Sequence, residues 1–203
     1  MRFTLGVDEA GRGPLAGPVA VGVIMVPEGF DVARAFPGVA DSKKLSEKKR
    51  AAIYTMLEER AARGDIRFTV ELEDAEMIDR EGIVPAVRRA LARGVDKLVE
   101  CESQTLTSLC KSDFHILLDG SLKAPIEYAQ ETIIGGDALV PIISLASIAA
   151  KVARDRLMLA LAKEYPAYGF ERHKGYGTRL HYDMLLKHGL SVIHRRSFVH
   201  LAD

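Results

Sequence analysis

Cysteine and tryptophan are scarce in this 203-residue chain, which has two cysteines and no tryptophan. Cys101 and Cys110 form no C-x-x-C pair, and their spacing suits neither a zinc site nor a disulfide framework. The sequence therefore argues against a disulfide-stapled secreted protein and against a structural zinc protein. Reduced thiols in a cytoplasmic protein are the simplest interpretation.

Long apolar runs are also missing. No stretch approaches the ~18 apolar residues that indicate a membrane-spanning helix, and Gly6, Asp8 and Glu9 interrupt the N-terminus where a signal peptide would be apolar. No G-x-x-x-x-G-K-[ST] segment is present, which excludes a P-loop. Lysine plus arginine and aspartate plus glutamate both number 28, so the formal net charge is zero. Any basic surface for nucleic acid must therefore be local.

What the chain does contain is typical of a globular α/β protein. Apolar residues make up 48% and charged residues 28% of the sequence. Apolar or alternating segments predict strands at residues 3–7, 19–26, 66–72, 114–118 and 131–134. Helical periodicity predicts helices at residues 47–64, 84–98, 142–164 and 179–188, with Ser46 and Thr178 as caps of the first and last and Tyr165-Pro166 ending the third. We expect a mixed central sheet flanked by helices, with a helical C-terminal part, in one domain spanning residues 1–203.

One of these helices has an alternative. The apolar positions from Val84 to Leu98 keep a helical rhythm through Gly94. A break at Gly94 followed by a strand at residues 96–100 fits the same pattern, and residues 103–112 fit a short helix or a loop.

Acidic residues follow three of the predicted strands. Asp8 and Glu9 directly follow the first strand, Asp119 follows the fourth, and Asp137 follows the fifth after two glycines. Ligands collect at the carboxyl ends of strands in open α/β sheets, so we expect these four carboxylates in one small volume. Because side chains alternate along a strand, Asp8 and Glu9 both face that volume only if the chain bends at Glu9. Each segment by itself is also compatible with a polar turn.

Four carboxylates without a neighbouring His or Cys set indicate a hard cation, Mg²⁺ or Mn²⁺, rather than zinc. Buried carboxylates that repel one another are costly, and a cation removes that conflict. Two ions about 4 Å apart would bridge a phosphate and support in-line displacement. We therefore predict a metal site, with catalytic function, at Asp8, Glu9, Asp119 and Asp137.

Two short segments are candidates for binding phosphate. Gly11, Arg12 and Gly13 form a turn in which backbone amides and a guanidinium can approach an anion closely. Lys43 and Lys44 lie just before a predicted helix N-terminus, where amides and ammonium groups act together on a phosphate.

The remaining basic and aromatic residues have less specific interpretations. Lys48, Lys49 and Arg50 are interpreted as a solvated helix face. Tyr176 lies between two glycines, which suits stacking on a sugar or base. The alternative for Tyr176 is a tyrosine at the edge of the core.

Taken together, these segments resemble the bacterial ribonuclease HII family, the type 2 ribonucleases H. The resemblance spans nearly the whole chain in the expected order, and the combination of motifs is far more specific than any one of them. It is carried by VDEAGRGPLAGPV (7–19), DSKKLS (41–46), LLDG (117–120), GGD (135–137), SLASIAAKVARDR (144–156), YGFERHKGYGT (168–178) and HRRSF (194–198).

The resemblance implies a ribonuclease H-like fold and endonucleolytic cleavage of RNA in RNA/DNA hybrids. It also implies incision 5′ of single ribonucleotides embedded in duplex DNA, as in ribonucleotide excision repair, leaving a 3′-hydroxyl and a 5′-phosphate. The family's four catalytic acids fall on Asp8, Glu9, Asp119 and Asp137. No membrane partner is expected, and a monomer is the default.

The resemblance also assigns the substrate-binding residues. The family's Gly-Arg-Gly motif falls on Gly11 to Gly13, which would contact the 2′-hydroxyl of the ribonucleotide and the flanking phosphate. That hydroxyl distinguishes RNA from DNA at one nucleotide. Its substrate-sensing tyrosine falls on Tyr176. One departure concerns Gly135, where many members have a basic residue, so one phosphate contact is weakened here.

Two other functions compete with this interpretation. A non-catalytic nucleic-acid-binding module on the same fold would not need clustered acids, because carboxylates repel phosphates. A phosphotransferase acting on small molecules would need a nucleoside pocket, and the sequence contains no recognisable one.

Overall fold

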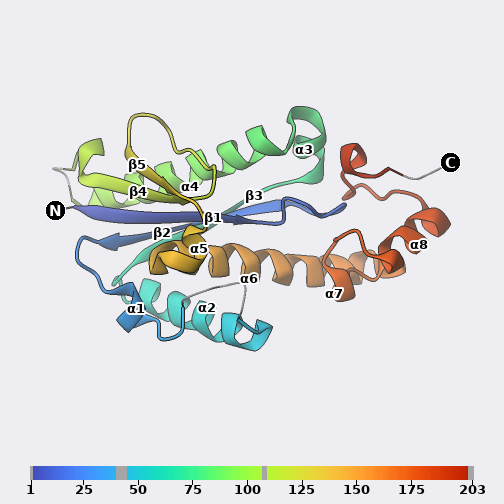
Figure 1. Ribbon diagram of the computed structural model, residues 1–203, viewed down its shortest axis with the longest axis horizontal. Helices are drawn as coiled ribbons and strands as arrows, with labels where there is room; N and C mark the ends of the chain where they lie inside the picture. The colour runs from blue at the N-terminus through green and yellow to red at the C-terminus, as the bar shows by residue number, and fades with distance from the viewer. Residues whose placement is uncertain (1, 40–44, 107–108, 201–203) are drawn as a thin grey trace.

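The computed structural model describes residues 2–39, 45–106 and 109–200 (Figure 1). Within them, one sheet has the strand order β3-β2-β1-β4-β5. Its strands are β1 (Phe3–Ala10), β2 (Val19–Pro27), β3 (Arg67–Glu73), β4 (Phe114–Asp119) and β5 (Ala129–Ile133). β1 pairs antiparallel with β2 and parallel with β4, β2 pairs antiparallel with β3, and β4 pairs parallel with β5. The predicted mixed sheet is confirmed.

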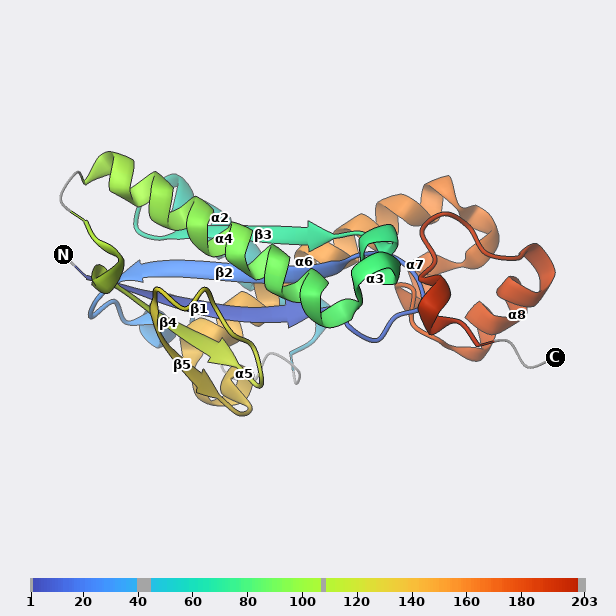
Figure 2. The ribbon, with the colours of Figure 1, turned by 90° about the horizontal axis from the view of Figure 1, so that it is seen from above.

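Helices cover both faces of this sheet. In Figure 1, α3 and α4 lie on one side of the strands, while α1, α2 and α6 lie on the other. Figure 2 shows α4 running along the upper face. The helices are α1 (Val32–Ala35), α2 (Glu47–Ala62), α3 (Ala75–Glu81), α4 (Ile83–Thr105), α5 (Gly136–Leu139), α6 (Pro141–Glu164), α7 (Phe170–His173) and α8 (Arg179–His188).

Glycines in the strands let α6 lie unusually close to the sheet. A Cβ added to Gly6 in β1 would lie 2.6 Å from the backbone oxygen of Ile142. A Cβ added to Gly22 in β2 would lie 2.3 Å from the backbone oxygen of Ala146. Real Cβ atoms do not approach a carbonyl so closely, so only glycine permits this contact. Through it, α6 is placed directly beside the strand that carries Asp8 and Glu9.

The other face is covered by α4, which runs without a break through Gly94. The predicted helix is confirmed here, and the alternative of a break with a strand at 96–100 is wrong. A glycine inside a helix costs ~1 kcal/mol relative to alanine. A Cβ at Gly94, however, would lie 2.7 Å from Cγ2 of Val23, so the glycine allows α4 to pack against β2.

The C-terminal part lies beyond the end of the sheet toward which β1 runs (Figures 1 and 2). It contains α7, α8 and the short 3-10 helices η3 (Pro166–Tyr168) and η4 (Arg196–Phe198). Leu15, Met158, Phe170 and Leu185 belong to its buried apolar cluster. The backbone amides of Arg196 and Ser197 also donate to the Asp79 carboxylate at 2.7 and 3.0 Å. The tail is therefore tied to α3 as well as to α6.

Candidate active site

Asp8 and Glu9 lie inside β1 and not beyond its end, which corrects the expectation that the strand stops at Val7. β1 stays paired with β2 as far as Ala10, whereas its pairing with β4 ends where Val7 is opposite Leu118. The expected bend at Glu9 is therefore wrong, because Glu9 still pairs with Val21. The end of β4 leaves room beside the two acids.

Asp119 and Asp137 approach this place from the neighbouring strands. Asp119 is the last residue of β4, and Asp137 lies in the first turn of α5, which is separated from the end of β5 by two residues. The backbone amide of Asp137 donates to Oδ1 of Asp119 at 3.3 Å. Gly135 begins this turn at φ +70°, a left-handed conformation that favours glycine. The Asp137 residue is 2% exposed.

The electrostatics show that three of the acids influence one another. Asp8 is 5% exposed, and its pKa is raised to about 8, with burial as the largest cause. The charges of Glu9 and Asp119 contribute in the same direction. The Ser147 hydroxyl and the Glu9 amide, whose nitrogen lies 2.7 Å from Oδ1 of Asp8, lower the pKa and partly offset these effects. Burial also raises the pKa of Glu9. The Arg12 guanidinium lowers it in part, because its Nη1 lies 3.2 Å from Oε1 of Glu9.

As placed, the acids do not enclose a cation. Among residues 2–39, 45–106 and 109–200, no group of three or more His, Cys, Asp or Glu side chains is arranged to hold a metal ion. The donor set still fits a hard cation, because it consists of carboxylate oxygens. Burial and mutual repulsion disfavour the charged form of Asp8, and a divalent cation would relieve both effects.

Arg195, from the C-terminal tail, holds the Gly-Arg-Gly turn from behind. Its guanidinium donates from Nη2 to the Gly11 oxygen at 2.7 Å, from Nη1 to the Arg12 oxygen at 2.8 Å, and from Nε to the Gly17 oxygen at 2.9 Å. The Arg195 residue is fully buried. Charge-assisted bonds to three carbonyls fix the path of this loop.

Arg154 of α6 braces the same loop and connects it to the Tyr176 segment. It donates from Nε to the Pro18 oxygen at 2.8 Å, from Nη2 to the Ala16 oxygen at 3.1 Å and from Nη1 to the Lys174 oxygen at 3.0 Å. Its Cζ lies 5.7 Å from the centre of the Tyr176 ring. The two loops are therefore held in a defined relation to each other.

A cavity of about 320 Å³ lies where these elements meet. Tyr176 is 40% exposed there, and Nζ of Lys151 lies 5.6 Å from its ring centre. Its exposure leaves the ring available to a ligand, and the buried Arg154 guanidinium also lies near it. The lining residues are Glu9, Ala10, Gly11, Arg50, Ser147, Lys151 and Tyr176.

Three polar lining residues were not singled out as site residues from the sequence. Arg50 was interpreted as part of a solvated helix face, but it lines the cavity and its guanidinium donates to the Leu45 oxygen. Ser147 and Lys151 are four residues apart on α6, so they share one face of that helix. The sequence shows this spacing, but it does not show that this face of α6 lies beside Glu9 of β1. The candidates Lys43 and Lys44 lie outside the described residues.

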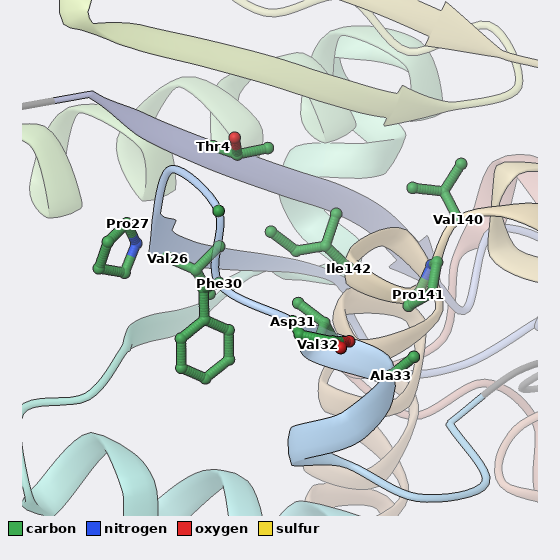
Figure 3. Close-up of a pocket in the computed structure, with 11 residues that line it drawn as sticks. Thr4, Val26, Pro27, Phe30, Asp31, Val32, Ala33, Val140, Pro141 and Ile142 are labelled. Atoms are coloured by element: carbon green, nitrogen blue, oxygen red, sulfur yellow. The ribbon is translucent and has the colours of Figure 1, made fainter.

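A second cavity, of about 220 Å³, lies near the start of β1 (Figure 3). Thr4, Phe30 and Ile142 are among its mainly apolar lining residues. None of the four candidate acids, all of which lie in the described part of the chain, contributes to it. Of the four, Glu9 lines the cavity beside Tyr176.

Comparison with known proteins identifies the family. The model of the family described as Ribonuclease HII matches residues 5–201. Ribonuclease HII of Endomicrobium trichonymphae is 45% identical over 199 residues, which cover 98% of this chain and 86% of that protein. This chain belongs to the ribonuclease HII family. Ribonucleases HII are metal-dependent endoribonucleases that degrade RNA in RNA/DNA hybrids, so the non-catalytic and phosphotransferase alternatives are set aside.

Solved structures agree with the ribonuclease HII assignment. The crystal structure of the ribonuclease H2 from Pyrococcus horikoshii OT3 has a TM-score of 0.67 and 26% identity, covering 96% of this chain and 93% of that one. Bst-RNase HIII, solved in complex with Mn²⁺, has a TM-score of 0.69 at 17% identity, covering 93% of this chain and 63% of that one. The expected ribonuclease H-like fold is confirmed. Among the described residues of this ribonuclease HII, no helix is long and apolar enough to cross a membrane.

Proposed function

We propose that this ribonuclease HII incises duplex DNA on the 5′ side of a single embedded ribonucleotide, in addition to degrading RNA in hybrids. The catalytic residues in this proposal are Asp8, Glu9, Asp119 and Asp137. One observation carries it: buried Asp8 is electrostatically coupled to Glu9 and Asp119, and Glu9 lines a cavity together with Gly11 and Tyr176. The acidic centre and the cavity are therefore adjacent, and Glu9 belongs to both.

Two Mg²⁺ or Mn²⁺ ions would be held by the same four carboxylates. When bound, such ions supply a water nucleophile at neutral pH and neutralise charge on the scissile phosphate. The chain itself orients the donors. The Ser147 hydroxyl and the Glu9 amide hold the Asp8 carboxyl, and the Asp137 amide holds Asp119. The expected products are a 3′-hydroxyl and a 5′-phosphate.

Recognition of the ribonucleotide is proposed to come from the loops that the two buried arginines hold. Gly11, Arg12 and Gly13 would contact the 2′-hydroxyl and the adjacent phosphate. Tyr176 would stack on the neighbouring sugar, with its ring already oriented beside Lys151. Lys43 and Lys44 are proposed phosphate contacts on sequence grounds alone.

The setting of the enzyme is also part of the proposal. Residues 1–203 would act as one catalytic domain and as a monomer. Exposed free thiols at Cys101 and Cys110 suit the reducing cytoplasm. The substrates would be RNA/DNA hybrids and ribonucleotide-containing duplex DNA.

The test is an incision assay on three matched duplexes: all DNA, DNA with one ribonucleotide, and an RNA/DNA hybrid. With Mg²⁺, we expect cleavage of the second and third substrates, with a single cut 5′ of the lone ribonucleotide. EDTA should stop both reactions. Cleavage of the hybrid alone would refute the proposed single-ribonucleotide activity while leaving the family activity in place.

A further inference from the structure

Three buried histidines lie beneath the Tyr176 loop, outside the acidic centre. His173, His181 and His194 are 8%, 0% and 2% exposed. The rings of His173 and His181 stack with their centres 4.5 Å apart. Nε2 of His181 lies 3.1 Å from Nε2 of His194. The three side chains come from α7, α8 and the tail, so they connect the C-terminal elements to one another.

The hydrogen bonds of the two outer rings fix where their protons are. The Gly175 amide donates to Nδ1 of His173 at 3.3 Å, so that nitrogen carries no proton and Nε2 donates to the Tyr168 oxygen at 3.0 Å. The Ser191 amide donates to Nδ1 of His194 at 2.9 Å. A neutral His194 therefore carries its proton on Nε2.

The central ring has only one arrangement left. Because Nε2 of His194 is the donor, Nε2 of His181 accepts, and its proton is on Nδ1. That Nδ1 lies 3.0 Å from the backbone oxygen of Tyr176, to which it donates. A directed chain of hydrogen bonds thus runs from the Ser191 amide through His194 and His181 to Tyr176.

A proton added to any of the three rings would set two donors against each other. Burial, the largest cause in each case, lowers the pKa of all three histidines, and that of His194 to about 4. The neutral network is therefore the form present at pH 7. The neighbouring charged or titratable groups are Glu171, Arg172 and Lys174 around His173, His173 beside His181, and His181 and His173 beside His194.

We propose that His181, oriented by His194, is a positioning residue that fixes the backbone of Tyr176 and thereby the place of its ring at the cavity. His181 contacts the backbone of Tyr176 directly, because its Nδ1 reaches the Tyr176 carbonyl. The Thr178 amide donates to the same oxygen at 2.8 Å. Losing the imidazole leaves a turn held by fewer bonds, with a more mobile ring. The role in catalysis rests on the proposed recognition of single ribonucleotides by Tyr176.

The first test does not depend on activity. Ring-nitrogen NMR of the ¹⁵N-histidine-labelled protein at pH 7 reports the protonation of each nitrogen. We expect three neutral rings, with the proton on Nε2 in His173 and His194 and on Nδ1 in His181. A charged ring among the three, or His181 protonated on Nε2, would overturn the proposal.

The second test is a double-mutant cycle. His181→Phe keeps a ring but removes the donor, whereas the amide of His181→Asn can replace Nδ1. We expect His181→Phe to raise KM for the single-ribonucleotide duplex about tenfold, corresponding to a coupling within the usual range for contacting residues. KM for a long hybrid should change less than about twofold, which corresponds to less than about 0.4 kcal/mol. His181→Asn should restore most of the loss, and His188→Asn, on the exposed end of α8, is the matched control.

The Tyr176→Ala background decides whether the effect passes through the tyrosine. There, His181→Phe should cost nothing further. An equal loss on both substrates, or the same loss in that background, would show a structural role and overturn the proposal. If the wild type cleaves hybrids but not the single-ribonucleotide duplex, the proposed function fails, and the NMR experiment still tests the positioning of Tyr176. The NMR experiment is also the deciding test if His181→Phe does not fold.

Discussion

The Gly-Arg-Gly turn allows a sharp test, because its two glycines have opposite surroundings. Gly11 has φ +88°, and a Cβ there would lie 2.1 Å from Nε and 2.4 Å from Cδ of Arg154. Gly13 has no atom within 4 Å of the same added carbon. We therefore expect Gly11→Ala to be strongly destabilising and Gly13→Ala to be nearly silent in stability.

Two costs contribute to the Gly11→Ala effect. A left-handed backbone costs a residue with a Cβ about 1–2 kcal/mol. Overpacking against a buried side chain costs about 1–3 kcal/mol, and Arg154 cannot move aside without losing its bonds to the Pro18, Ala16 and Lys174 oxygens. The free energy of unfolding should therefore fall by about 2–5 kcal/mol. At about 2–4 °C per kcal/mol, Tm falls by roughly 4–20 °C.

Urea and thermal unfolding of both variants measure this difference directly. Gly13→Ala should lie within about 0.5 kcal/mol of the wild type, as is usual for exposed substitutions. If Gly11→Ala were as stable as the wild type, or if both variants lost the same stability, the account of the Arg154 contact would be refuted.

Three further predictions concern the acids, the tyrosine and the histidines. Asp119→Asn should abolish hybrid cleavage while circular dichroism and Tm show a folded protein; full activity would remove Asp119 from the proposed mechanism. Tyr176→Ala should lower incision at a single ribonucleotide by about tenfold, corresponding to a stacking loss of about 1–3 kcal/mol, with little change in Tm; a large fall in Tm would instead support a core role. The lowered pKa of His194, about 4 against 6.5, means that the unfolded chain takes up a proton between those pH values that the native state does not. The free energy of unfolding should therefore fall by about 3 kcal/mol as pH drops from 6.5 to 4, and His194→Gln should flatten that slope; an unchanged slope in urea unfolding across this range would contradict the prediction.

Local signals in the sequence predicted most of the fold. Ser46 and Thr178 were expected as helix caps, and their hydroxyls each accept from the third amide of their helix at 3.3 Å. The long helix ending at Glu164 was predicted from its apolar rhythm and the Tyr165-Pro166 pair that follows it. These features depend on neighbouring residues, which is why one sequence is enough to see them.

Long-range contacts were much harder to predict. Glu9 was placed beyond its strand, because pairing with β2 continues after pairing with β4 has ended. Arg50, Arg154 and Arg195 look like ordinary solvated cations in the sequence. Arg154 and Arg195, however, donate to loop carbonyls that lie more than 100 residues earlier in the chain. No local pattern reveals such a contact.

The brace that Arg195 gives to Gly11 and Gly17 has a consequence for biosynthesis. The acidic strand is synthesised long before Arg195, which follows Gly11 by 184 residues. Until Arg195 has been made, the nascent chain has these carboxylates but not the guanidinium that holds the loop beside them. The loop therefore takes its final shape after the strand that carries the acids has already been synthesised.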